Sequence, residues 1–178
     1  TLSVRTRAAA GQLPQLFGQT YGVIMQYLGE LGEQPVGMSF AAYYNMDMQD
    51  LDIEIGFPVS RPLPDRGNIH SGALPAGPIA VTMHIGPYDT VGPAYEALTH
   101  YAQANGYAPS GVAYEFYFSD PQTPPEQIQT QVMFPLQPVL QLACSAVETH
   151  SSVFVPRPCL KVGRYVDPGR TTPRSKMR

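Results

Sequence analysis

Two copies of one pattern stand 74 residues apart in the sequence, and this duplication restricts the possible folds more than any other feature. Residues 17–32 place apolar side chains at intervals of three and four, which is typical of one face of a helix. The glycine that ends this stretch is a helix stop signal. Residues 91–106 repeat the same phases and the same final glycine. A chain built in this way must bury two equivalent helical faces.

Two strands are predicted after each helix. The first reads GMSFAAYYNMD over residues 37–47 and GVAYEFYFSD over residues 111–120, again 74 positions apart. The second reads DIEIGFPV over residues 52–59 and QTQVMFPL over residues 129–136, and there the spacing is 77. Apolar residues alternate in both second strands, as expected for strands with one buried face. The turn between the two strands is therefore three residues longer in the second copy.

A further strand is predicted before each helix, at residues 4–10 and, more clearly, at residues 78–84. Each copy is thus a strand-helix-strand-strand unit. A unit of about 60 residues buries too little surface to be stable alone, so we expect the two units to pair. The expected fold is α+β, with pseudo-twofold symmetry, a mostly antiparallel sheet, helices on one face and a ligand groove at the seam, where pockets commonly form.

The domain prediction follows from the extent of the repeats. Repeat 1 covers about residues 1–60 and repeat 2 about residues 78–138, and the segment 61–77 between them is rich in proline and glycine without an apolar period. Residues 1–138 are therefore expected to form one domain. The stretch 139–178 is basic and rich in proline and matches neither repeat, so it is predicted to be a largely disordered extension. A segment that binds anionic partners and a shifted reading frame are the alternatives.

The net charge of −3 hides a strong asymmetry along the chain. Residues 1–156 contain four arginines and thirteen acidic side chains, whereas residues 157–178 contain seven basic and one acidic. Gripping a phosphate backbone requires clustered Lys and Arg, so the acidic body is not expected to contact nucleic acid directly. Its field favours cationic ligands instead.

Other classes of protein find little support in the sequence. No apolar run approaches the roughly 18 to 20 residues of a membrane-spanning helix, and no signal-peptide pattern is present, so a soluble cytoplasmic protein without membrane contact is expected. Cys144 and Cys159 make neither a zinc spacing nor a disulfide framework, and no metal or other cofactor is expected. Because the chain begins with Thr1, a missing N-terminal DNA-binding domain remains open.

The motifs together resemble a known family. MHIGPYDTVGPAYEAL, GVAYEFYFSDP and TQVMFPL are similar to the second half of a GyrI-like small-molecule-binding domain, and QPVGMSFAAYY with LDIEIGFPV to its first half. The resemblance runs from about Val4 to Leu136. It implies the duplicated fold that serves as the drug-sensing part of AraC-type and MerR-type regulators. Stand-alone members of this family act as protein inhibitors or as hydrolases of strained electrophilic compounds.

Glu115 is the most informative single residue, because it lies inside an apolar and aromatic strand. Strand alternation puts it on one face with Ala113 and Tyr117, opposite an apolar set. If the apolar set packs on the helices, Glu115 faces the groove, where a carboxylate beside aromatic rings would suit a flat cation. The resemblance implies that Glu115 is the central ligand-contacting or catalytic carboxylate. A solvated position on the sheet face is the alternative.

Several other residues join Glu115 in the predicted ligand-binding set. The full set is Glu115, Tyr117, Tyr43, Ala41, Tyr88, Glu54 and Met133. Alternatives stay open for three of them: Tyr88 as the first core residue of the second helix, Glu54 as a solvated edge charge, and Met133 as ordinary core packing.

The primary functional hypothesis is a multidrug-sensing or effector-binding domain for a small hydrophobic, cationic molecule, as part of a transcriptional regulator. A stand-alone hydrolase is the second hypothesis, with Glu115 as acid or base and Tyr43 or Tyr117 positioning water or the electrophile. The chain has no Gly-x-Ser-x-Gly motif and no phosphate-binding glycine loop, so the sequence supports no catalysis by a serine nucleophile or on a bound nucleotide. A protein inhibitor or adaptor is the third hypothesis.

Overall fold

The computed structural model describes residues 1–120 and 122–139, and it confirms two strand-helix-strand-strand units. The elements of the first unit are β1 (Leu2–Ala8), α1 (Leu13–Glu30), β2 (Phe40–Tyr43) and β3 (Leu51–Phe57). Those of the second unit are β5 (Ile79–Ile85), α2 (Gly92–Ala104), β6 (Tyr107–Pro109), β7 (Ala113–Tyr117) and β8 (Gln129–Pro138). Short 3-10 turns occur at Ala10–Gln12, Tyr88–Thr90 and Pro125–Gln127. Apart from Val139, the predicted extension lies outside the described residues.

Two short strands were not expected from the sequence. β4 (His70–Ser71) lies within the segment interpreted as a plain connection, where it pairs with the start of β1. β6 follows α2 directly and pairs with the end of β8. Both are two or three residues long, too short for alternation to be visible in the sequence.

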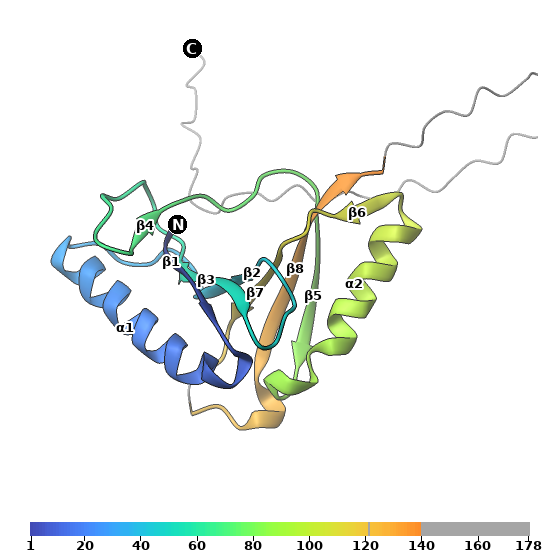
Figure 1. The fold of residues 1–178 in the computed structure, drawn as a ribbon, viewed down its shortest axis with the longest axis horizontal. Helices are drawn as coiled ribbons and strands as arrows, with labels where there is room; N and C mark the ends of the chain where they lie inside the picture. Colours follow the sequence, from blue (N-terminus) through green and yellow to red (C-terminus); the bar gives the residue numbers. More distant parts are fainter. Residues whose placement is uncertain (121, 140–178) are drawn as a thin grey trace, which may run out of the picture.

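The strands form one antiparallel sheet in the order β4-β1-β3-β2-β7-β8-β5, with β6 attached to β8. Each unit supplies three consecutive strands, and the units join where β2 pairs with β7. Figure 1 shows α1 and α2 on either side of these central strands. No helix among the described residues is long and apolar enough to cross a bilayer.

The register between β2 and β7 locates the symmetry axis of the fold. Ala41 is paired with Glu115, which is its own counterpart 74 residues later. On either side, Phe40 pairs with Phe116 and Tyr43 pairs with Ala113. A residue can pair with its own counterpart only on the axis that relates the two copies. The pseudo-twofold axis therefore passes through the pair formed by Ala41 and Glu115.

Both helices cover the same face of the sheet, and this is the face that carries Glu115. Phe17 and Tyr21 of α1 pack against Ala41 and Tyr43, and they share a cluster with Ile53 and Ile55 of β3. Leu98 and Ala102 of α2 pack against Ala113, Val132 and Phe134. The supposition that the apolar set of the central strand packs on the helices is therefore wrong.

The apolar set of β7 instead forms a second core on the back of the sheet. Tyr114 and Phe116 pack there with Phe40, and Leu74 of the connecting segment covers them. Alternation separates the two faces of a strand but does not say which face the helices take. Both faces of this sheet are largely apolar near its centre, so the sequence pattern left the choice open.

Gly56 of β3 provides a test of the close approach between β1 and β3. A methyl group there would lie 2.4 Å from the Leu2 carbonyl oxygen and 2.6 Å from the Ser3 Cβ, so the strands would have to separate. We expect Gly56→Ala to lower the free energy of unfolding by about 1 to 3 kcal/mol, the usual cost of overpacking. Gly22, inside α1, has no atom within 4 Å of such a methyl group. Gly22→Ala should therefore raise stability by about 0.5 to 1 kcal/mol. Urea denaturation of both variants checks the pair, and equal effects would contradict the packing described.

Candidate functional site

Glu115 forms the centre of a hydrogen-bonded cluster on the helix face of the sheet. Its side chain is buried, with 7% of the residue exposed. The Tyr95 hydroxyl of α2 donates to Oε1 at 2.7 Å, and the Tyr117 hydroxyl donates to Oε2 at 2.9 Å. The Tyr43 hydroxyl lies 3.3 Å from the Tyr117 hydroxyl. Because Tyr117 donates its own hydrogen to Glu115, its oxygen accepts the hydrogen bond from Tyr43. Four residues from β2, β7 and α2 thus share one network.

The tyrosines around Glu115 are two pairs of repeat counterparts. Tyr21 corresponds to Tyr95 in the helices, and Tyr43 corresponds to Tyr117 in the central strands. The first copy has Ala41 where the second has Glu115, so only the second copy supplies a carboxylate to the tyrosines. With no carboxylate on its side, Tyr21 donates to the backbone carbonyl of Phe40 at 3.3 Å. The site is therefore symmetric in its aromatic residues and asymmetric in its charge.

The carboxyl group of Glu115 is buried and forms no ion pair among the described residues. All four arginines of the described residues are engaged elsewhere, in ion pairs of Arg5 with Asp52, Arg7 with Asp50, Arg61 with Glu33 and Arg66 with Glu30. Burial raises the pKa of Glu115, while the hydrogen bonds from Tyr95 and Tyr117 and the charge of nearby His84 oppose that rise. A group of this kind gains from any cation brought to it.

The tyrosines themselves act as hydrogen-bond donors. Burial, and then the negative charge of Glu115, raise the pKa of Tyr43, Tyr95 and Tyr117 above the ordinary value for a phenol. They keep their protons at neutral pH and are unsuited to act as bases. Their arrangement instead supports a carboxylate that is surrounded by hydroxyl donors.

Aromatic rings surround Tyr117 on the helix face. Phe17 of α1 lies 5.7 Å from it, centroid to centroid, and Tyr88 meets it edge-on, also at 5.7 Å. Tyr88 belongs to the short turn before α2 and is 51% exposed, so it is not the first core residue of that helix. It lies at the outer side of the cluster, where a ligand can reach it.

A small apolar hollow adjoins Tyr43 on the same face. Its volume is about 120 Å³, and it is lined by Tyr43, Asn45, Met46, Pro109, Gly111, Val112, Ala113 and Phe134. Engineered apolar cavities of roughly 150 Å³ accommodate benzene, so the hollow is close to the size of one aromatic ring. A larger, more polar hollow of about 400 Å³ involves Phe118, Asp120 and Gln129 and does not include Glu115.

Two residues of the predicted set, Glu54 and Met133, do not lie with Glu115. The strand pleat places both on the back of the sheet, so grouping them with Glu115 was wrong. Met133 is core packing between Phe40 and Tyr114. Glu54 accepts hydrogen bonds from Ser3 and Tyr44, each at 2.6 Å.

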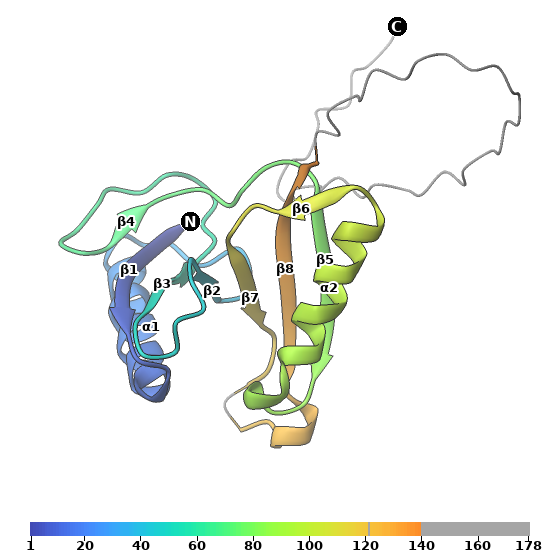
Figure 2. The ribbon, with the colours of Figure 1, turned by 45° about the vertical axis from the view of Figure 1, so that its right-hand side comes forward.

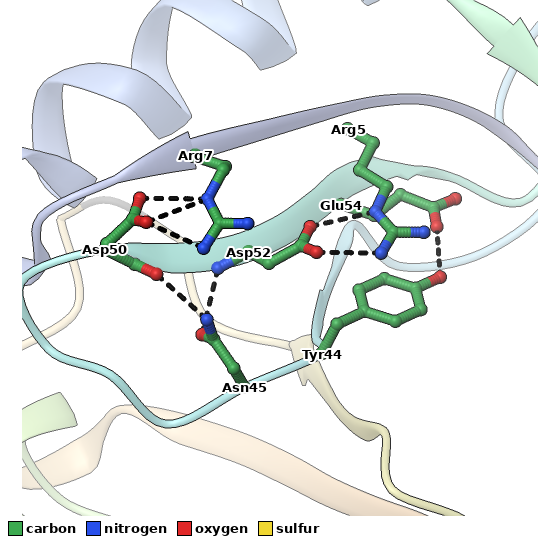
Figure 3. Close-up of polar contacts among 7 residues, drawn as sticks. All are labelled: Arg5, Arg7, Tyr44, Asn45, Asp50, Asp52 and Glu54. Carbon is green, nitrogen blue, oxygen red and sulfur yellow. Dashed lines mark hydrogen bonds and ion pairs between the residues drawn. The ribbon is translucent and has the colours of Figure 1, made fainter.

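Figure 3 shows the surroundings of Glu54 as a band of polar contacts on β1 and β3. The Arg5 guanidinium lies over the Tyr44 ring, 3.7 Å from its centroid, and pairs with Asp52 at 2.8 Å. Arg7 pairs with Asp50 at 2.7 Å. These charges satisfy one another, so the band needs no ligand.

Tyr21, Tyr95 and Phe17 lie on the side of the candidate site but were not predicted from the sequence to belong to it. They occupy apolar phases of the two helices and were interpreted as core. The signal that was available is the tyrosine at equivalent positions 21 and 95, because a buried hydroxyl needs a partner. The partner of Tyr95 is on a strand 20 residues away, which no local pattern reveals.

A metal site finds no support in the described parts of the chain, where His, Cys, Asp and Glu form no cluster of three or more that could hold an ion. His84 is engaged locally, with its Nε2 3.0 Å from the Pro87 carbonyl oxygen and 3.2 Å from the Thr90 hydroxyl.

Comparisons with known proteins concern the family and the fold of the chain. The profile of a family described as the GyrI-like small molecule binding domain matches residues 2–137. No curated protein matches the chain. Among solved structures, that of the EcmrR–DNA complex by cryo-electron microscopy is similar over 78% of this chain and 53% of that one, with 22% identity and a TM-score of 0.66. This chain therefore spans about half the length of that relative.

Two further structures extend the comparison. The crystal structure of the EcmrR C-terminal domain is similar over 78% of this chain and 92% of that one, with 21% identity and a TM-score of 0.63. A hydrolase from Listeria innocua is similar over 76% and 86%, with 14% identity and a TM-score of 0.55. At such identities the likeness concerns the fold alone.

The raised pKa of Glu115 predicts how stability changes with pH. Below the ordinary pKa of a carboxyl group, Glu115 is protonated in both the folded and the unfolded chain. Above it, the unfolded chain loses this proton first, so the folded state is progressively disfavoured until the pH passes the raised value. The Glu115→Gln variant lacks this penalty.

We therefore expect the stability difference between wild type and Glu115→Gln to be constant at acid pH and to shift in favour of the variant as pH rises above about 4.5. Urea denaturation of both proteins between about pH 4 and pH 8 measures it. Parallel stability curves over the whole range would show that burial does not perturb this carboxyl group.

Proposed function

The chain belongs to the GyrI-like family of small-molecule-binding domains, and from that premise we propose that the cluster around Glu115 binds a lipophilic organic cation. The observation that carries the proposal is the carboxyl group at the symmetry axis, which is buried among tyrosines from both repeats and forms no ion pair among the described residues. A cation placed there would remove the cost of the unpaired charge.

Aromatic residues support the same class of ligand. The rings of Phe17 and Tyr88 pack against Tyr117, which donates to Glu115, and each ring can attract a cation by about 0.5 to 2 kcal/mol. The hollow beside Tyr43 adds room for one aromatic substituent. A hydrophobic cation with an aryl group would use all three features.

The excess of acidic side chains favours small cations as ligands of this domain. In a longer protein, nucleic acid would be bound by another part of the chain. Its four arginines are committed to ion pairs, while twelve acidic side chains lie within residues 1–120 and 122–139. In the structure of EcmrR bound to DNA, the part similar to this chain makes up 53% of the EcmrR chain. We therefore propose that the domain is the effector-binding part of a transcriptional regulator. A ligand held between the repeats would bias two arrangements of the regulator by its different affinity for each.

Hydrolysis is the second candidate, and one observation favours it. Glu115 has the raised pKa and the hydroxyl partners of a group that could exchange a proton with a bound electrophile or water. The Listeria innocua hydrolase shares the fold. In this scheme Tyr117 would position the reacting group rather than act as a base.

The test uses an aryl quaternary ammonium ion and its uncharged carbon isostere, measured by isothermal titration calorimetry. We expect the wild type to bind the cation at least tenfold more tightly than the isostere, which is about 1.4 kcal/mol. Glu115→Gln should abolish this preference and leave binding of the isostere unchanged. Affinity of the wild type for the cation should increase with pH, because binding requires the carboxylate.

Glu54→Gln is the matched control, because Glu54 is also a strand glutamate with two hydroxyl donors but lies on the opposite face. It should bind both compounds as the wild type does. Equal affinities for cation and isostere in the wild type would refute the cation site. Mass spectrometry of a strained electrophile after incubation separates the second candidate, since only a hydrolase converts it, and only with Glu115 intact.

A further inference from the structure

The two edges of the sheet are finished differently. On the first repeat, β1 is covered by β4, and the arginine-carboxylate band of Figure 3 runs along the back of β1 and β3. On the second repeat, β5 is the last strand, and among the described residues it pairs only with β8. Figure 2 shows β5 at the margin of the sheet beside α2. Its outer row of backbone groups has no strand beside it in the described part of the chain.

The back of β5 is apolar at the positions where the back of β1 is polar. In the sheet register, Ser3, Arg5 and Arg7 of β1 correspond to Val81, Met83 and Ile85 of β5. These three apolar residues are 49%, 43% and 64% exposed. The residues opposite them on β8 also differ from their counterparts on β3.

The partner strand of β5, β8, carries no charged side chain at the matching positions. Asp52 and Glu54, which face Arg7 and Arg5 from β3, correspond to Gln129 and Gln131, which face Ile85 and Met83 from β8. The same chain therefore provides its own comparison. In the first copy this surface carries ion pairs, which suit contact with water. In the second copy the same surface is uncharged and largely apolar.

An edge of this kind is normally protected. Proteins blunt edge strands with charged residues, prolines, bulges or very short length, because an open edge is a template for another strand. The seven residues of β5 include no Lys, Arg, Asp or Glu, no proline and no bulge in their pairing with β8. We infer that β5 is an interaction surface, and we propose that its partner is β5 of a second copy of this chain.

The sequence of β5 is suited to pairing with itself in the antiparallel direction. It reads IAVTMHI, and its apolar back-facing residues are placed symmetrically about Thr82. With Thr82 opposite Thr82 of the second copy, Val81 lies opposite Met83 and Ile79 lies opposite Ile85. Each exposed apolar residue then meets an apolar residue on the same face, and no charge is brought near a like charge. This is a closed twofold contact, which forms a dimer and not a fibre.

Joining two edges would extend the sheet across both copies and bring the apolar side chains of each into cross-strand contact, which reduces their exposure. The contact is a single strand pair, so it belongs to the small class of interfaces, and we expect a dissociation constant on the order of micromolar. The backbone and apolar character of the contact predicts little dependence on salt. A different association, between the basic tail and the acidic body, would weaken as salt is added.

Sedimentation velocity of the full chain at roughly 1 to 100 µM, with reducing agent to prevent links through Cys144 or Cys159, tests the proposal. We expect the wild type to dimerise, and Val81→Lys to weaken the dimer at least tenfold. Val23→Lys is the matched control, because Val23 is 48% exposed on α1 and the change in charge is the same. It should dimerise as the wild type does.

Ile85→Lys provides a second variant, at the exposed end of the strand, in case Val81→Lys disturbs folding as judged by circular dichroism. A monomeric wild type at the highest concentration would overturn the proposal. So would a dimer that survives both β5 substitutions, or one that dissociates as salt is raised, since either result would assign the association to another surface.

Discussion

The pairing of Ala41 with Glu115 is the contact on which the rest of this structure depends. It joins the two three-stranded halves of the sheet and lies on the axis that relates them. A residue on that axis meets its own counterpart, so glutamates in both copies would place two carboxylates opposite each other in a buried site. Alanine in the first copy avoids this repulsion. The result is one carboxyl group at the centre of a ring of aromatic residues contributed by both repeats.

The isolation of that carboxyl group has a cost in stability and, in the function proposed, a use in binding. Tyr95 and Tyr117 supply hydrogen bonds, but no basic side chain of the described residues forms an ion pair with this carboxyl group. A fold optimised for stability alone would place an apolar or amide side chain there. Retaining a buried acid is the pattern expected of a site that reserves part of its free energy for a ligand.

The two copies share the strand-helix-strand-strand order of elements, and they differ in the side chains that form the candidate site and the back surface of the sheet. The first copy contributes the uncharged side of the site and a back surface of ion pairs. The second copy contributes the carboxyl group and an apolar edge. Because the backbones correspond, each difference can be assigned to side chains at matched positions. The second copy therefore carries both the charge of the ligand site and the proposed contact between chains.

The sequence by itself determined the repeat, the order of elements in each unit, the acidic body and the position of Glu115 on a central strand. These follow from spacing and periodicity, which are local properties of the chain. Only the tertiary structure decided which face the helices cover, because both faces of the central strands are apolar and alternation is blind to that choice. It thereby placed Glu54 and Met133 on the face opposite the candidate site and brought Tyr21 and Tyr95 to its side, each with a hydrogen-bond partner distant in sequence. The axis at Ala41 and Glu115 likewise required the register of β2 against β7, which no pattern within one strand encodes.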